Sequence, residues 1–295
     1  MQFMRIIPSK YIFFFIGLLI LQFFSPAPTA AVEENSGKYF ESLQKKLITD
    51  GFDKSTIAEL YNSPKVFFET KGVSRLLVHR EDQLNYDQYA TKESIQKALK
   101  YLAKHQSELE STEMAYNVSK EIITAIILVE SQFGTVTDGP SILNTLSTIA
   151  SLADPDVRDM FWSKVSSSTQ FKRKNFEKWT GKKSRWAYHE LKAFLKYAAR
   201  EKMDPVSING SFAGAMGIAQ FMPSSILAYA KDGDSDGRID LFSHADSIAS
   251  IANYLNHYGW HMEIGRKKAQ KIIHRYNHSD HYVDIIFKIS ELLQG

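Results

Sequence analysis

Glu130 lies at the end of a strongly apolar segment, residues 120–134, which reads KEIITAIILVESQFG. Its aliphatic residues leave almost no polar face, so we expect a helix that runs through the core, with Ser119 as the N-cap and Gly134 as the stop. Apolar surroundings favour the protonated carboxyl group, which would make Glu130 a usable general acid. Taken alone, however, the segment favours a carboxylate that emerges into water at the helix end.

A second segment, residues 210–225, combines small residues with two polar ones and reads GSFAGAMGIAQFMPSS. Its glycines and alanines remove side-chain bulk, so a ligand or another part of the backbone can approach closely. Ser211 and Gln220 can hydrogen-bond a sugar or a peptide amide. Tight helix packing with two solvated polar residues is an equally good interpretation of this segment alone.

The third segment, residues 232–246, is rich in aspartate and reads DGDSDGRIDLFSHAD. It matches the first half of an EF-hand calcium loop, in which alternate carboxylates, a glycine and a backbone carbonyl converge. The corresponding residues are Asp232, Asp234, Asp236, Gly237 and Arg238. Ser243 replaces the usual bidentate glutamate, and Asp246 is the nearest substitute. We expect calcium here, because three converging carboxylates repel one another unless neutralised; a metal-free turn is the alternative.

The elements that must position these residues are predicted to be helices. Apolar residues recur at helical spacing in three further segments, residues 95–102, 191–198 and 282–293. Only residues 63–77 are ambiguous between helix and strand, and the lysine-rich residues 167–185 indicate a surface excursion between helices. The fold class expected from this pattern is mostly α.

Composition excludes several classes of protein. The 295 residues are 44% hydrophobic and carry a net charge of +3, which does not indicate a nucleic-acid-binding protein. The sequence has no cysteine, which excludes disulfides, thiolate nucleophiles and an N-terminal lipid-modified cysteine.

Residues 1–31 predict a cleaved signal peptide. They combine the basic residues Arg5 and Lys10, an apolar run and a stretch of small residues suited to a cleavage site. An uncleaved membrane anchor is the alternative, although the apolar run is short for a spanning helix.

Together these segments resemble the membrane-bound lytic transglycosylase B family, the family 3 lytic transglycosylases of bacterial cell-wall turnover. The resemblance rests on LVESQFG at 128–134, on the blocks at 210–225 and 232–246, on SIANYLNHYGW at 250–260 and on YNHSDHYV at 276–283. It implies a lysozyme-like multi-helix domain with an EF-hand-like loop and at most a small β element. The implied division is a signal peptide at 1–31 and a transglycosylase domain at 32–295, with an N-terminal helical part (32–114) and a catalytic core (115–295).

The resemblance also assigns roles to individual residues. Glu130 falls on the family's single catalytic acid/base. The residues that fall on the family's sugar cleft are Ser211, Gln220, Tyr254, Tyr276, Asn277 and Tyr282. The calcium ligands are expected to be Asp232, Asp234, Asp236, the carbonyl of Arg238, and Asp246. The chain departs from the family at Gln132-Phe133, where Arg and Tyr or Trp are more common, at Leu128 and at Ile218-Ala219.

One catalytic carboxyl group suffices for chain cleavage if the nucleophile lies within the substrate. The motifs therefore favour a peptidoglycan lytic transglycosylase, in which the C6 hydroxyl of N-acetylmuramic acid closes onto C1 to give a 1,6-anhydro product. A lysozyme-like muramidase would need a second acid to activate water, for which Asp138 or Asp204 would have to serve. An inactive murein-binding scaffold is the third hypothesis for the function. We expect a monomer in the periplasm or cell envelope, with glycan strands as partners, structural calcium and no organic cofactor.

Overall fold

The structure is a computed structural model, and it describes residues 36–78 and 84–295. These residues form thirteen α-helices and two short 3-10 helices, so the prediction of a mostly α fold is confirmed. The helices are α1 (Glu41–Thr49), α2 (Lys54–Asn62), α3 (Thr70–Val78), α4 (Lys92–Lys104), α5 (Gln106–Tyr116), α6 (Lys120–Ser131), α7 (Ile142–Ser151), α8 (Pro155–Val165), α9 (Arg173–Arg200), α10 (Pro223–Tyr229), α11 (His244–His257), α12 (Arg266–Tyr276) and α13 (Asp280–Gln294). The 3-10 helices are η1 (Ser36–Phe40) and η3 (Tyr86–Ala90).

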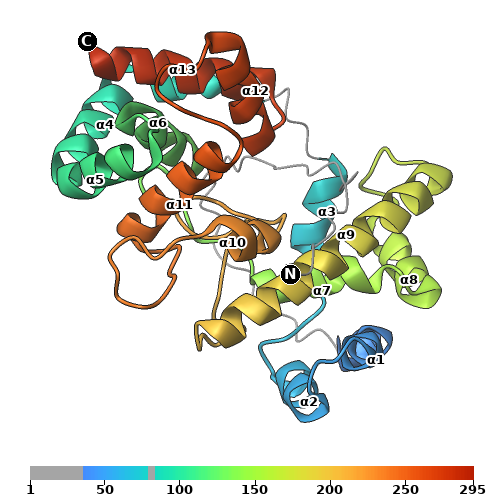
Figure 1. Cartoon of the computed structure of the whole chain (residues 1–295). Coiled ribbons are helices and arrows are strands. Elements are labelled where there is room, and N and C mark those ends of the chain that lie inside the picture. Colours follow the sequence, from blue (N-terminus) through green and yellow to red (C-terminus); the bar gives the residue numbers. More distant parts are fainter. Residues whose placement is uncertain (1–35, 79–83) are drawn as a thin grey trace, which may run out of the picture.

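The helices form two groups that meet at α10 and α11 (Figure 1). In one group α6 packs against α13, α4 and α5, while α11 packs against α5. In the other group the long helix α9 packs against α7 and α10, and α3 lies against α7 and α8. A single hydrophobic cluster nevertheless runs from Phe40 to Leu293, so both groups share one core. The division of the domain at residues 114 and 115 stays a prediction.

Helix α6 runs through the core as the sequence indicates. Every residue from Ile122 to Ser131 is buried. Ser119 occupies the N-cap position, but its side chain makes no capping hydrogen bond. The helix ends earlier than predicted, because Gln132 adopts the left-handed conformation at the C-cap (φ 48°), two residues before Gly134.

The other helix predictions have mixed outcomes. The apolar residues predicted at 191–198 and 282–293 are buried in α9 and α13. In α4, by contrast, Leu99 is 47% exposed, and the helix buries Ala98 and Tyr101 instead. The ambiguous segment 63–77 resolves as a non-helical stretch followed by α3. The expected surface excursion at 167–185 is wrong for the most part, since α9 begins at Arg173 and continues for 28 residues.

The segment between α9 and α10, residues 201–222, is non-helical, and its backbone lies close to other elements. The described residues contain two isolated β-bridges, Ser141 with Asn209 and Met216 with Phe221, and no longer strand. Gly217 has a positive φ of 75°, and a Cβ there would collide with the backbone of Leu241. Glycine is therefore needed at this position, since both the conformation and the close approach exclude a side chain.

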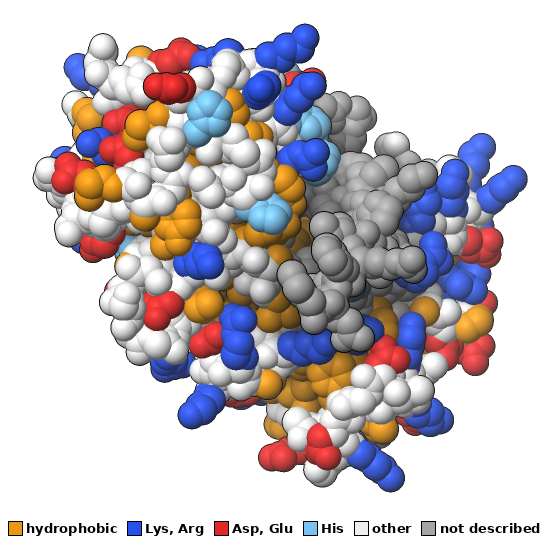
Figure 2. Space-filling model, viewed as in Figure 1, with side chains coloured by type: hydrophobic (Ala, Val, Ile, Leu, Met, Phe, Trp, Pro, Cys, Tyr) orange, Lys and Arg blue, Asp and Glu red, His pale blue; other side chains and the backbone are white. Residues whose placement is uncertain are grey.

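Charge is distributed evenly enough to agree with the small net charge of the sequence. Basic and acidic side chains are interspersed over much of the face drawn in Figure 2. Among the described helices, none has the length and apolar character needed to cross a membrane. The predicted signal peptide, residues 1–31, lies outside the described residues.

Candidate active site

Glu130 lies in the last turn of α6, where its side chain is only 4% exposed. The hydroxyl of Tyr282, a fully buried residue of α13, donates a hydrogen bond of 2.6 Å to Glu130 Oε1. Burial, followed by the negative charge of Glu130, raises the pKa of the Tyr282 phenol well above 10, so this hydroxyl keeps its proton and remains a donor. The structure thus rejects the alternative that Glu130 emerges into water.

A continuous group of aromatic side chains extends from Tyr282. Tyr276 stacks on Tyr282 with ring centroids 6.4 Å apart, and Tyr254 meets Tyr276 edge-on at 5.2 Å. The Tyr276 hydroxyl donates to the carbonyl of Ala219 at 2.6 Å, and the Tyr254 hydroxyl donates to the carbonyl of Arg275 at 2.9 Å. These contacts join α11, α12 and α13 to the loop before α10, and they fix the wall that carries Tyr282.

Two further tyrosines near Glu130 escaped the sequence analysis. Tyr86 of η3 packs edge-on against Tyr282 at 6.1 Å. Tyr89, also on η3, is 3% exposed, and burial together with the charge of Glu130 raises its pKa to about 12. Its hydroxyl pairs with the side chain of Gln132, directly beyond the end of α6. Residues 84–91 carry no pattern that marks them as part of a site, so only packing reveals these residues.

The segment 210–225 folds into a tight loop whose polar residues are engaged mainly with its own backbone. Ser211 is fully buried, and its Oγ accepts hydrogen bonds from the N–H groups of Ala213 and Ala215. Gln220 adopts a left-handed conformation (φ 48°) and its Nε2 donates to the carbonyl of Gly217 at 2.8 Å. The main contacts of Ser211 therefore hold the conformation of its own loop. The sequence alone did not predict this structural role.

Two buried amide side chains in this region retain unused hydrogen-bonding capacity. Gln220 is 3% exposed, and its Oε1 has no partner among the residues that the structure describes. Asn277, which follows α12, is 1% exposed, and both atoms of its amide lack partners in the same part of the chain. Buried polar atoms without partners are rare and destabilising, so a ligand or water that completes them is expected.

The other buried acids are committed elsewhere. Glu190, on α9, is fully buried and accepts hydrogen bonds from the backbone and hydroxyl of Ser224, both at 2.9 Å. Glu201 pairs with Arg200 and accepts from the backbone of Ile239. Asp138 and Asp204, the two acids that a muramidase reading would need, are exposed. Of the buried acids in the described residues, Glu130 is the one that contacts the tyrosine wall.

The aspartate-rich loop brings three of its predicted ligands together. Oxygen atoms of Asp232, Asp234 and Asp246 lie within 4.8 Å of one another. Asp246 is 2% exposed, and burial raises its pKa, with a further increase from the two neighbouring carboxylates. Asp236 does not join this group; its Oδ1 accepts from the backbone N–H of Arg238 at 2.8 Å.

Comparisons with known proteins agree with this arrangement. The family model described as the transglycosylase SLT domain matches residues 35–270. Membrane-bound lytic murein transglycosylase B of Escherichia coli K12 is 34% identical over 232 residues, which cover 74% of this chain and 56% of the relative. The match thus spans little more than half the length of that relative.

Two solved structures show the same fold. The E. coli lytic transglycosylase Slt35 in complex with calcium aligns with a TM-score of 0.67 and 24% identity, over 87% of this chain and 92% of Slt35. SltB3 from Pseudomonas aeruginosa in complex with NAG-NAM-pentapeptide aligns with a TM-score of 0.68 and 18% identity, over 89% of this chain and 80% of SltB3.

Proposed function

This chain belongs to the transglycosylase SLT domain family, and from that premise we propose that it is a peptidoglycan lytic transglycosylase. It would cleave the β-1,4 bond between N-acetylmuramic acid and N-acetylglucosamine and leave a 1,6-anhydromuramic acid end. The relative from E. coli is named for this reaction, and SltB3 was solved with a peptidoglycan fragment. Both facts describe those proteins and support the proposal for this one.

Glu130 carries both proton transfers in the proposed reaction. Its carboxyl group first donates a proton to the glycosidic oxygen as the bond from C1 to that oxygen breaks. The resulting carboxylate then takes the proton of the muramoyl C6 hydroxyl while O6 bonds to C1. Glu130 ends the cycle protonated, as it began, and neither an external water nor a redox group takes part.

The observation that carries the proposal is the contact between Glu130 and Tyr282. A donor at 2.6 Å stabilises the carboxylate that forms after the first proton transfer, and burial keeps bulk water away from it. The other buried acids of the described residues are tied to Ser224, to Arg200 and Ile239, or to the aspartate-rich loop, so none of them is free to serve as its second carboxyl group. A hydrolase with two carboxylates would need one.

The unsatisfied amides supply the contacts that would hold the sugar. Gln220 Oε1 can accept a hydrogen bond from a substrate N–H or O–H, and the amide of Asn277 can both donate and accept. Tyr276 precedes Asn277 in the chain and donates a hydrogen bond to the carbonyl of Ala219, the neighbour of Gln220, so it links the two amides. A muramoyl ring held in this way would place its own C6 hydroxyl against C1, an advantage of proximity over water.

Mass spectrometry of digested murein tests the proposal. Muropeptides that end in 1,6-anhydromuramic acid, lighter by one water and without a reducing end, are the expected products. Predominantly reducing-end muropeptides would instead identify a muramidase. No loss of turbidity from a murein suspension would identify a scaffold, the reading that the departure at Gln132-Phe133 suggests.

We also propose that the aspartate-rich loop binds calcium. Carboxylate oxygens are the ligands that this hard cation prefers, and the three that converge here repel one another without a positive charge between them. Asp232, Asp234 and Asp246 would hold the ion, with Asp236 and the carbonyl of Arg238 as the remaining ligands expected from the EF-hand pattern. Bound calcium would fix the loop against α11, whose first turn contains Asp246.

The proposed location is the cell envelope, where the substrate is found. The support is the apolar segment within residues 1–31 and the relative's name as a membrane-bound murein enzyme. Intact mass spectrometry of protein from the native host tests this part. A mature chain that begins near Ala31 or Val32 is expected, whereas retention of residues 1–30 with membrane pelleting would mean an anchored enzyme.

A further inference from the structure

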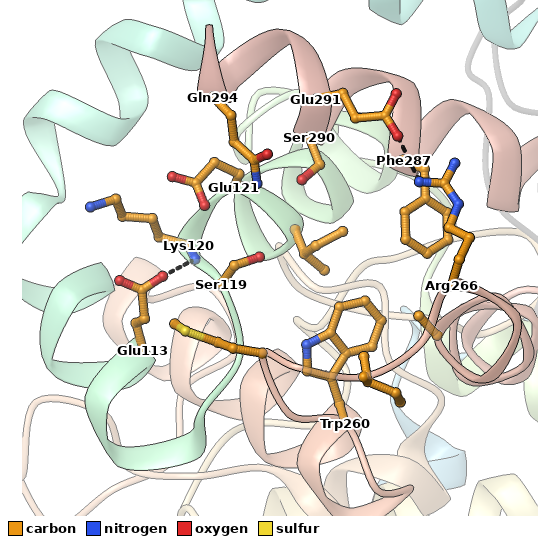
Figure 3. Close-up of a pocket in the computed structure, with 14 residues that line it drawn as sticks. Glu113, Ser119, Lys120, Glu121, Trp260, Arg266, Phe287, Ser290, Glu291 and Gln294 are labelled. Carbon is orange, nitrogen blue, oxygen red and sulfur yellow. Dashed lines mark hydrogen bonds and ion pairs between the residues drawn. The ribbon is translucent and has the colours of Figure 1, made fainter.

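A cavity lies at the opposite end of α6 from Glu130. It has a volume of about 670 Å³, within the range typical of small-molecule sites. The N-terminus of α6, the segment that leads into α12 and the C-terminal half of α13 form its walls (Figure 3). Ten residues of helix separate Lys120 from Glu130, roughly 15 Å at the usual rise, so this cavity and the candidate active site are separate places.

Aromatic residues form one side of this cavity. Trp260 and Phe287 lie nearly parallel, with ring centroids 6.4 Å apart, and both line it. The Arg266 guanidinium lies 3.8 Å from the Phe287 centroid and pairs with Glu291 at 2.6 Å, so it already covers one face of that ring. The arrangement leaves apolar surface for the carbon skeleton of a ligand, without an open cation site on Phe287.

Several polar groups around the cavity have no hydrogen-bond partner among the described residues. Ser290 is 4% exposed, and its hydroxyl points into the cavity with no hydrogen bond, as does the hydroxyl of Ser119 at the start of α6 (Figure 3). The indole N–H of Trp260, a residue only 5% exposed, is also unbonded, and the Gln294 amide faces the same space. None of these polar atoms is fully buried, so each can bond a ligand in the cavity without first breaking a hydrogen bond to a described residue.

The charges of the lining disfavour an anionic ligand. Three acids, Glu113, Glu121 and Glu291, face two bases, Lys120 and Arg266. The Lys120 ammonium lies 3.8 Å from Glu110 Oε1, and Arg266 is paired with Glu291, so no base is left in excess to hold a phosphate or carboxylate. A neutral ligand rich in hydroxyl and amide groups fits this lining best.

We propose that this cavity is a second saccharide site that binds an N-acetylhexosamine unit. Ser119, Ser290, Gln294 and the Trp260 N–H would hydrogen-bond its hydroxyl and acetamido groups, while the apolar lining would pack against its ring and methyl group. The source of the sugar rests on the proposed function, since a glycan strand cut at one end of α6 also supplies N-acetylated sugars to the other. Such a site would retain the enzyme on its insoluble polymer between cleavage events.

Tryptophan resonances distinguish this site from the candidate active site. The chain has 4 tryptophans, of which Trp260 lines the cavity while Trp186 packs against Ala215 and Met222 of the loop that carries Gln220. Indole ¹H–¹⁵N signals of the Glu130→Gln protein, assigned by Trp→Phe variants, would be followed while the β-1,4-linked tetramer of N-acetylglucosamine is added. A saturable shift of the Trp260 signal, with a Kd on the order of 1 mM, is expected for a site that holds one ring.

Variants of the lining make the test specific. Gln294→Ala, at an exposed position near the C-terminus, and Ser290→Ala should each weaken the Trp260 titration by roughly two- to tenfold, the effect of one lost hydrogen bond. Gln170→Ala, an exposed glutamine outside the cavity, is the matched control and should leave the titration unchanged.

The outcomes separate the two proposals. The second site is overturned if the Trp260 signal stays in place while the Trp186 signal moves. It is also overturned if Gln294→Ala and Ser290→Ala leave the Trp260 titration unchanged. Both outcomes leave the proposed reaction intact. Absence of anhydro products from the unmutated enzyme overturns the proposed reaction, yet the Trp260 titration still decides on the second site by itself.

Discussion

The two groups of carboxylates in this protein have opposite surroundings. Glu130 is a single acid buried against tyrosines, and the hydroxyl of Tyr282 donates a hydrogen bond to it. In the loop at 232–246 three acids converge instead, and only Asp246 among them is buried. The first arrangement suits a group that alternately releases and accepts a proton. The second leaves an excess of negative charge in one place, which suits a divalent cation.

The difference shows that the environment of a carboxylate, more than its residue type, determines its chemistry. Tyr282 donates a hydrogen bond to Glu130 that stabilises its charged form, while burial favours the neutral one. An acid/base catalyst must be able to adopt both forms during the reaction. In the loop, backbone N–H groups of Gly233 and Asp240 bind Asp246 and hold it in place, so its position is set before any ion arrives.

Glu130→Gln should have the largest effect on activity, because an amide can neither donate nor accept the proton. Murein cleavage is expected to fall by about 10²–10⁴-fold or more, the usual contribution of acid–base catalysis. Turbidity loss and product yield measure it, with circular dichroism as the check on folding. Activity within about tenfold of the unmutated enzyme would remove Glu130 from its role.

Calcium addition tests the loop. The melting temperature should rise, because an ion bound only by the folded state stabilises it by about 2.7 kcal/mol at a hundred times its Kd. Asp234→Asn should abolish the rise, whereas Asp284→Asn, an exposed acid of α13 outside the loop, should preserve it. No rise at millimolar calcium would leave the loop as a turn without a metal, since weak extracellular sites have a Kd of roughly 10⁻⁴–10⁻³ M.

Tyr282→Phe tests how much the surroundings of Glu130 contribute, since it removes the hydrogen-bond donor and leaves the acid in place. A hydrogen bond to a charged group contributes about 1.5–3 kcal/mol, so kcat should fall by roughly 10- to 100-fold. Tyr61→Phe is the matched control, because it removes another buried hydroxyl, bonded to Ser147 at 2.7 Å. An equal loss of kcat in both variants would mean that general destabilisation, and not the contact with Glu130, explains the result.

The smallest effect is expected at His105, where α4 meets α5. Burial lowers its pKa below 6.5; the nearest charged groups are Glu108 and Lys104, and His244 packs against its ring. Because the unfolded chain binds this proton more readily, stability present above pH 6.5 is lost as the pH falls below it. His105→Gln should therefore reduce the drop in melting temperature between pH 7.5 and 5 by about 1–2 °C. An unchanged drop would contradict this assignment.

Local pattern was sufficient for much of the fold. The apolar run of α6 and the spacing in α9 and α13 predicted buried helices, since helical periodicity indicates which side of a helix faces the core. Alternate aspartates around a glycine likewise predicted a loop in which carboxylates converge, because that geometry arises within a few residues. Leu99 shows the limit: its spacing fitted an apolar stripe, yet the neighbouring elements left it exposed.

The sequence by itself determined the helical fold, the position of Glu130 at the end of an apolar helix and the acidic loop, all of which follow from residues close together in the chain. Only the tertiary structure decided that Tyr282, 152 residues away, donates to Glu130, and that Tyr86 and Tyr89 join it from a segment without a motif. It also brought Asp246 up to Asp232 and Asp234, and it formed the cavity at the far end of α6. Such contacts depend on how helices pack, and packing is fixed by the whole core and not by local spacing.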